Sequence, residues 1–321
     1  MARTVILSCD TESLLFPVSE AAVEANIFGG VSPGFGARWG IPLIMDLADR
    51  VGAKVLFFYD VFTEYSCPGI NGRVADEILS RGHFLELHTH IEHLPEWWWQ
   101  DRGYKRPGWA SNYFDPVTVD LVYSDAIRLF EKCAGVRPTA YRAGSWRFSA
   151  NILSFLARNG VRYSFNYHPL TTIRQNFPHG PDAGPLDLFI WSNGMLEIPV
   201  ATLTVPNPFT SKQKYFGFES HMLREPARYF DFMRVFARQM PTARHAVLVM
   251  HSWSLAEFAG NVATAPCAER TNAFAQFLEL GAKEGVHFAG ENLFQSLDAT
   301  QPQFTVPIEF AGFANSPLVK L

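Results

Sequence analysis

Short apolar runs alternate with amphipathic segments along most of the chain. The runs are rich in β-branched and aromatic residues, and each has the length of one buried strand; they lie at 4–9, 54–62, 84–88, 139–142, 162–166, 195–200, 245–250 and 286–289. Between them, apolar residues recur at helical spacing, as at Ile44, Leu47 and Val51 ahead of Gly52. Strands that alternate with helices predict an α/β protein with a mostly parallel sheet. Seven or eight such strands favour a distorted (β/α) barrel over an open sheet.

Three irregular stretches interrupt this alternation, near 94–115, 168–190 and 206–222, and they are rich in aromatic, polar, glycine and proline residues. Residues 13–40 are similar in composition and also predict a long surface loop. No internal repeat and no low-complexity linker divides the chain. We therefore expect a single domain over 1–321, with the three stretches as loop insertions.

Composition and charge narrow the class of protein. The 321 residues are 48% hydrophobic and 18% charged, which is ordinary for a globular protein. The net charge is -4 and no basic block occurs, so we expect no nucleic-acid partner. No stretch approaches the roughly 18 apolar residues of a membrane span. The first apolar run is also too short for a signal peptide. These features predict a cytoplasmic protein and do not indicate an oligomeric state.

Three of the ten histidines, His88, His90 and His93, directly follow the third apolar run. Strand side chains alternate with a period of two, so His88 and His90 project to the same side. His93 joins them only if the chain turns after His90. Because neutral imidazole is the commonest side-chain metal ligand, the cluster indicates a metal site that contains His88 and either His90 or His93.

Polar side chains also stand at the ends of other predicted strands. The first run ends in Asp10 and Glu12, the fourth ends in Arg142, and the seventh leads into His251. In a (β/α) barrel, the reacting groups lie at the carboxyl ends of the strands. Two histidines and one carboxylate leave open positions on a divalent ion for water and substrate, and the remaining groups are suited to proton transfer. This set predicts a metal-dependent hydrolase.

Four segments resemble, in the same order, the motifs of the polysaccharide deacetylases, the NodB-like carbohydrate esterases of family four. They are Cys9–Glu12, Gly82–His90, Tyr141–Gly144 and Val247–His251. The first segment has Asp-x-Glu in place of the adjacent aspartates of the family. The second has His-x-His, with Glu92 where the family has its second histidine, and it is similar to a subgroup associated with bacterial surface glycans. The fourth motif of the family has no counterpart, since Ser-Phe-Asn at 164–166 occupies its region.

The resemblance implies a role for each residue at the strand ends. It implies that Glu12, His88 and His90, or His93 as the alternative ligand, hold a divalent metal, which is zinc or else cobalt, nickel, manganese or iron. It further implies three catalytic residues. Asp10 accepts the proton of the attacking water, Arg142 holds Asp10 ionised, and His251 protonates the leaving amine. The reverse assignment, with Asp10 on the metal and Glu12 as the base, stays open.

The implied reaction is hydrolysis of an N-acyl group, above all N-acetyl, on an amino sugar or glycan precursor. Trp98, Trp146 and Trp253 are candidates for substrate binding, because aromatic faces suit the apolar faces of sugars. Two alternatives remain. One is an amidohydrolase that acts on a small non-sugar amide, and the other is a non-catalytic pseudoenzyme that binds glycans through its aromatic loops.

Overall fold

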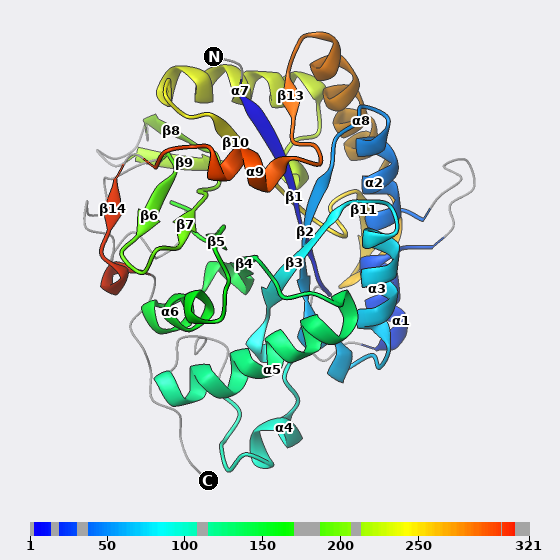
Figure 1. Ribbon diagram of the computed structural model, residues 1–321. Helices are drawn as coiled ribbons and strands as arrows, with labels where there is room; N and C mark the ends of the chain where they lie inside the picture. Colours follow the sequence, from blue (N-terminus) through cyan, green and yellow to red (C-terminus); the bar gives the residue numbers. More distant parts are fainter. Residues whose placement is uncertain are drawn as a thin grey trace.

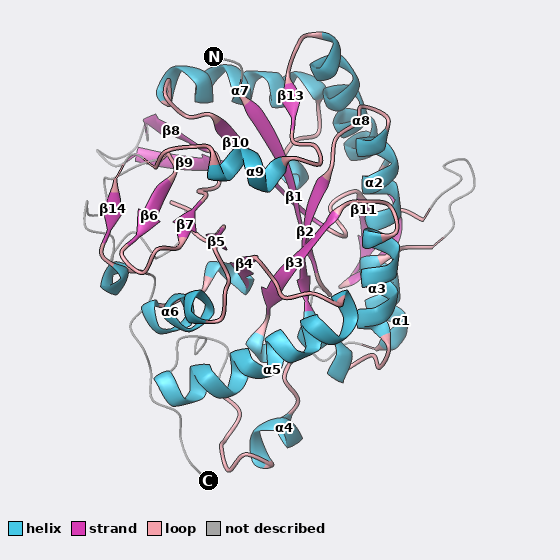
Figure 2. Cartoon of the chain, viewed as in Figure 1, coloured by secondary structure: helices cyan, strands magenta, loops and turns pink. Residues whose placement is uncertain are grey.

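The computed structural model describes residues 3–13, 19–30, 38–107, 115–169, 187–206, 213–302 and 304–311. A curled sheet forms its centre, and helices cover the outside of the curl (Figures 1 and 2). The sheet strands are β1 (Thr4–Thr11), β2 (Val55–Asp60), β3 (Phe84–Thr89), β4 (Ala140–Ala143), β5 (Tyr163–Ser164), β6 (Phe189–Trp191), β7 (Leu196–Glu197), β10 (His245–His251), β13 (His287–Phe288) and β14 (Thr305–Val306). The hairpins are β8 (Thr202–Pro206) with β9 (Gln213–Gly217), and β11 (Ala256–Ala259) with β12 (Val262–Pro266). The helices are α1 (Glu20–Ile27), α2 (Ile41–Asp49), α3 (Ile70–Leu79), α4 (Glu96–Gln100), α5 (Pro116–Ala134), α6 (Ala150–Arg158), α7 (Pro226–Gln239), α8 (Ala268–Lys283) and α9 (Leu293–Asp298).

The strand order is β10-β1-β2-β3-β4-β5-β7-β6-β14, and β13 also pairs with β1. Neighbouring strands run parallel from β10 to β7, and β6 is antiparallel to β7. The predicted α/β class and distorted barrel are therefore confirmed. The described part of the chain puts ten strands in this sheet, slightly more than the seven or eight expected, because short strands such as β6 and β14 extend its edge.

Alternating side chains divide each central strand between two apolar layers. On β1, Val5, Leu7 and Cys9 pack in the layer that contains the helices, whereas Ile6 packs in the inner layer. The inner layer also contains Leu56 and Phe58 of β2, Ala140 of β4, and Val247 and Val249 of β10. Because both faces are buried, these strands are nearly continuous apolar runs in the sequence, as parallel strands usually are. Towards the carboxyl ends, the inward positions become polar.

Helix α9 closes the opposite, amino-terminal end of the curl. Leu293 and Leu297 pack into the inner layer, and the Phe294 ring lies 5.3 Å from Phe84 and 4.9 Å from Tyr163. Phe84 and Tyr163 are the first residues of β3 and β5. Apolar side chains of α9 therefore cover the amino-terminal end of the inner layer.

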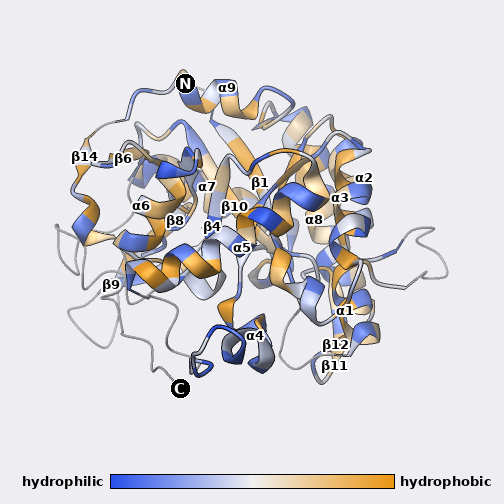
Figure 3. Cartoon of the chain, turned by 60° about the horizontal axis from the view of Figure 1, so that its bottom comes forward, coloured by the Kyte–Doolittle hydropathy of each residue, from blue (hydrophilic) through white to orange (hydrophobic). Residues whose placement is uncertain are grey.

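Helix α5 begins and ends where the sequence provides capping residues. The side chain of Asp115 accepts a hydrogen bond from the Thr118 amide at 3.0 Å, Pro116 stands in the first turn, and Gly135 ends α5 in the left-handed region. Hydrophobic and hydrophilic bands both run along α5 (Figure 3). Such a helix buries one face on the sheet. No described helix is long and apolar enough to span a membrane.

The stretches predicted to be loops contain several elements. Residues 20–27 form α1, which is capped by Ser19 and packs beside β12, where Asn26 accepts a hydrogen bond from the Ala263 amide at 2.9 Å. Helix α4 lies within the stretch near 94–115, and β9 lies within that near 206–222. These elements are short and depend on distant partners, so their local patterns are weak. Residues 108–114, 170–186 and 207–212 lie outside the described part of the chain.

Candidate active site

Glu12, His88 and His90 meet at the carboxyl ends of β1 and β3. The Nε2 atom of His88 lies 3.0 Å from Oε2 of Glu12, and Nε2 of His90 contacts the same oxygen. One ligand atom from each residue lies within 4.8 Å of the other two, and all three side chains are largely buried. Among the described residues, this is the group with the composition and spacing of a metal site. A carboxylate with two imidazoles is a donor set that fits zinc and other first-row divalent ions.

Hydrogen bonds on the outer nitrogens turn both imidazoles toward Glu12. The Nδ1 atom of His88 lies 2.8 Å from the Arg142 carbonyl oxygen, and Nδ1 of His90 lies 3.2 Å from Oε1 of Glu92. A carbonyl or carboxylate oxygen can only accept, so Nδ1 is the donor in both contacts. In a neutral imidazole, Nε2 then carries the lone pair, which is the arrangement that a metal ligand needs.

The site favours positive charge beside Glu12. Burial alone would raise the pKa of Glu12, but His90 and His88 hold it well below its ordinary value. Burial likewise opposes the charged form of His90, yet Glu12 and Glu92 hold the pKa of His90 well above the ordinary value. A bound cation would be stabilised by the same carboxylate.

His93 lies beside this group and not in it. The short turn Ile91–His93 leads its side chain to Asp60, with which Nδ1 forms a hydrogen bond. The other Asp60 oxygen accepts the backbone N–H of His90 at 3.1 Å. The structure therefore brings His90 to Glu12 and His88, whereas His93 and Asp60 together brace the turn behind it.

Asp10 forms a buried ion pair with Arg142 across the inner face of the sheet. An Arg142 terminal nitrogen donates to Oδ1 of Asp10 at 2.7 Å, the second donates to Ser8 Oγ at 2.9 Å, and Nε donates to the Phe165 carbonyl at 3.2 Å. The guanidinium is 0% exposed and lies 4.4 Å from the centre of the Phe58 ring. These contacts hold the Arg142 guanidinium in one orientation, with its positive charge facing the Asp10 carboxylate.

His251 ends β10, in register with Asp10 on β1. Its Nε2 lies 3.8 Å from Oε1 of Glu12, and its ring stacks on Trp253 with centroids 4.3 Å apart. Its Nδ1 is buried and has no hydrogen-bond partner within the described ranges. The His251 imidazole is thus held by stacking. It lies directly beside the cluster of Glu12, His88 and His90, which we call the Glu12 group.

Two of the three predicted substrate-binding tryptophans lie near these residues. Trp253 stacks on His251, and Trp146 lies 5.2 Å from the Arg142 guanidinium and 4.9 Å from the His168 ring. Ser145 and Trp146 both have left-handed backbone, with φ of 51° and 57°. Non-glycine residues in this region are strained, and such strain concentrates at functional sites.

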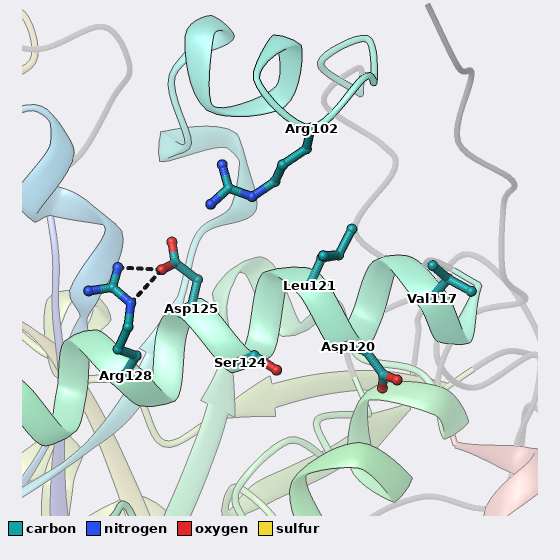
Figure 4. Close-up of a pocket in the computed structure, with 7 residues that line it drawn as sticks. All are labelled: Arg102, Val117, Asp120, Leu121, Ser124, Asp125 and Arg128. Atoms are coloured by element: carbon teal, nitrogen blue, oxygen red, sulfur yellow. Dashed lines mark hydrogen bonds and ion pairs between the residues drawn. The ribbon is translucent and has the colours of Figure 1, made fainter.

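Trp98 differs from the expectation for a sugar-stacking side chain. It is 1% exposed, its indole N–H donates to Asp125 at 2.8 Å, and Arg102 lies over its ring at 3.8 Å. Figure 4 shows Arg102 and Asp125 in a surface pocket beside α5, where Asp125 also pairs with Arg128. This pocket shares no residue with the Glu12 group. The prediction that Trp98 binds substrate is wrong. Trp98 is a core residue, because no face of its ring is open to a sugar.

Folding adds further polar residues that the sequence pattern did not single out. Glu219 lies 3.2 Å from His168 and 3.5 Å from His221, and the His221 ring lies 6.0 Å from that of His251. Burial acts to raise the pKa of Glu219, but the three nearby histidines lower it. These residues come from stretches predicted to be loops, and a bridge between Glu219 and Val249 joins one of them to β10. No local signal marked them.

Asn166, in the region of the missing fourth motif, braces the ends of β4 and β5. Its Oδ1 accepts the Ala143 amide at 2.7 Å, and its Nδ2 donates to Ser164 Oγ at 2.9 Å. These bonds explain why a polar residue is fully buried there.

Neither a family model nor a curated protein matches the sequence. Among solved structures, a protein from Mycobacterium smegmatis described as a polysaccharide deacetylase is 17% identical, covers 94% of this chain and 92% of its own, and superposes with a TM-score of 0.54. The chain has the polysaccharide deacetylase fold.

This deacetylase fold is also similar to two enzymes that act on α-glucans. The α-amylase AmyC from Thermotoga maritima is 9% identical over 98% of this chain and 78% of its own, with a TM-score of 0.54. A 4-α-glucanotransferase from Thermococcus litoralis is 11% identical over 97% of this chain and 42% of its own, with a TM-score of 0.53. The fold alone therefore does not choose between amide and glycoside chemistry, and the choice depends on the residues of the site.

Proposed function

We propose that this protein is a metal-dependent hydrolase that removes an N-acetyl group from an amino sugar in a glycan or glycan precursor. The observation that carries the proposal is the meeting of Glu12, His88 and His90 next to His251, on the same inner face as the Asp10–Arg142 pair. The fold shared with the Mycobacterium smegmatis protein supports it.

Glu12, His88 and His90 would hold the ion, either zinc or else cobalt, nickel, manganese or iron. When bound, such an ion polarises the amide carbonyl and lowers the pKa of water from 15.7 toward about 7. Glu12 is assigned as the ligand because the two imidazoles face its carboxylate, whereas the carboxylate of Asp10 faces Arg142.

Asp10 would accept the proton of the attacking water. The charge-assisted hydrogen bond that Arg142 donates to Asp10 fixes the orientation of this carboxylate. His251 would then donate a proton to the nitrogen of the leaving amine as the C–N bond breaks. Stacking on Trp253 holds the plane of the His251 ring during this transfer.

The aromatic side chains near the site favour a sugar over a small aliphatic amide. Trp253 and the partly exposed Trp146 offer ring surface beside His251 and Arg142. Hydrolysis of a glycosidic bond fits the residues less well, since that reaction commonly uses a pair of carboxyl groups as acid and base or nucleophile. Here Glu12 contacts two imidazoles and Asp10 pairs with an arginine.

Acetate release tests the proposal. The protein would be reconstituted with zinc, cobalt, nickel, manganese or iron and incubated with chitin oligosaccharides, nucleotide-linked N-acetyl sugars and a small N-acetyl amide. We expect acetate from at least one sugar substrate. Folded protein that releases no acetate with any of these metals, while still binding the sugars, would indicate a glycan-binding pseudoenzyme. Release from the small amide alone would indicate the other amidohydrolase.

The Asp10→Asn variant tests the assigned roles. It should lower the rate of acetate release by about 10²- to 10⁴-fold, the usual contribution of a general base, and retain the metal. Asp101→Asn, a matched change at an exposed turn position, should leave the rate unchanged. Loss of the metal from Asp10→Asn would instead reverse the roles of Asp10 and Glu12.

A further inference from the structure

Glu92 is a largely buried carboxylate that contacts the side chain of His90. It lies four residues after His88, and its side chain is 9% exposed. Oε1 lies 3.2 Å from Nδ1 of His90, and Oε2 is buried with no hydrogen-bond partner among the residues that the structure describes. A buried carboxylate is costly unless it is paired, so this contact calls for a physical reason.

The contact determines how His90 presents its ring. The carboxylate accepts a hydrogen bond from Nδ1–H, which leaves Nε2 on the side of Glu12. The backbone is fixed as well, because Asp60 accepts the N–H of His90 at 3.1 Å. His88 receives the equivalent support from the Arg142 carbonyl, which is neutral, whereas Glu92 carries a charge.

We propose that Glu92 is a positioning residue that makes His90 a competent ligand for a divalent cation. Its carboxylate holds the ring in place and increases the electron-donating strength of Nε2, as outer carboxylates do for metal-bound histidines. The chain thus has a ligand at 90 and a supporting carboxylate at 92. This inference rests on the proposed metal site, but it concerns a residue that does not touch the ion.

Zinc affinity of the metal-free full-length protein, measured by competition with a chromophoric chelator, tests the inference. Glu92→Ala should weaken zinc binding by about 10- to 100-fold, as loss of outer partners typically does. Glu92→Gln should show a smaller loss, since its amide oxygen can still accept from Nδ1 but carries no charge. Glu96→Gln, a nearby change at an exposed position, should bind like the unmodified protein.

The absorption spectrum of the cobalt-loaded protein provides a second reading. In Glu92→Ala, the visible bands should change in intensity because His90 is displaced from its position at the ion. A folded Glu92→Ala protein with unchanged zinc affinity and cobalt spectrum would overturn the role of Glu92 alone. If Glu92→Ala fails to fold, the zinc affinities of Glu92→Gln and Glu96→Gln are compared instead. Equal affinities would overturn the role of Glu92. If the unmodified protein binds neither metal, the proposed metal site itself is wrong, and this inference fails with it.

Discussion

Gly144 leaves the space that the His90 ring occupies. A Cβ atom at 144 would lie 2.7 Å from atoms of the His90 ring, closer than side-chain atoms approach one another. We predict that Gly144→Ala displaces the ring and weakens zinc binding by at least about tenfold, the lower end of the loss seen when a ligand's support is removed. The comparison is the zinc affinity of Gly144→Ala and of Gly72→Ala. Gly72 lies within helix α3, and a Cβ atom added there would meet no other atom within 4 Å.

Gly72→Ala should bind zinc normally and should stabilise the protein by up to about 1 kcal/mol, because alanine favours a helix over glycine. Equal zinc affinity in the two variants would show that the ring can move without loss, and that Gly144 is not needed for the site.

Arg142 is the guanidinium partner of the buried Asp10 carboxylate, so its removal should lower the free energy of unfolding. Arg142→Ala leaves the Asp10 carboxylate without its guanidinium partner, and we predict a loss of about 3–5 kcal/mol in the free energy of unfolding. Asp10→Asn combined with Arg142→Ala should lose less than the sum of the two single changes. Urea unfolding of the three variants measures this coupling, and strict additivity would contradict it.

Sequence alone predicted the residues whose environment is set by strand alternation. Asp10, His88, Arg142 and His251 all lie on the inner face toward the carboxyl ends of their strands, as the period of two requires. The environment of Trp98 could not be predicted in this way, because its indole N–H donates to Asp125, a residue 27 positions away on α5.

Glu86 links strand β3, to which it belongs, to the start of β4 by hydrogen bonds. Its carboxyl accepts hydrogen bonds from the amides of Thr139 and Ala140 and from the Thr139 hydroxyl. Burial raises the pKa of Glu86 to about 7, although these bonds act in the opposite direction. The folded protein therefore keeps a proton that the unfolded chain has lost, and stability falls as the pH rises from about 4.5 to about 7.

Glu86→Gln should remove this part of the pH dependence. The glutamine oxygen can accept from both amides, and the Thr139 hydroxyl can turn to accept from the new NH2 group. Between about pH 5 and pH 8, the unmodified metal-free protein should lose up to about 3 kcal/mol more stability than the variant. Urea unfolding at the two pH values measures the difference. Parallel pH profiles would show that Glu86 is ionised in the folded protein throughout this range.

The elements that the sequence predicted are those with a strong local pattern. The central strands have both faces buried, and helices such as α5 carry capping residues and an apolar stripe. Helix α1 and the β8–β9 hairpin were missed because they are short and are stabilised by contacts with distant elements. The same reason explains why Glu219 and His221 were not predicted near His251.

In the whole molecule, the apolar contacts of α9 and the candidate site lie at opposite ends of the curled sheet. Helix α9 and its apolar contacts lie at the amino-terminal end, whereas the candidate metal ligands gather at the carboxyl end. The deacetylase fold is shared with enzymes that act on glycosidic bonds, so the overall shape does not determine the reaction. The ligand set at the strand ends is what the proposed function depends on.

A crystal structure of the zinc-loaded protein, with the ion located by its anomalous scattering, is the decisive test of the metal site on Glu12, His88 and His90. We predict one strong peak about 2.0–2.2 Å from a carboxylate oxygen of Glu12 and from Nε2 of both His88 and His90. Asp10 should remain paired with Arg142 and not bind the ion. A peak on His93 and Asp60, or no peak at the Glu12 group in a protein saturated with zinc, would contradict the assignment of Glu12, His88 and His90 as the metal ligands.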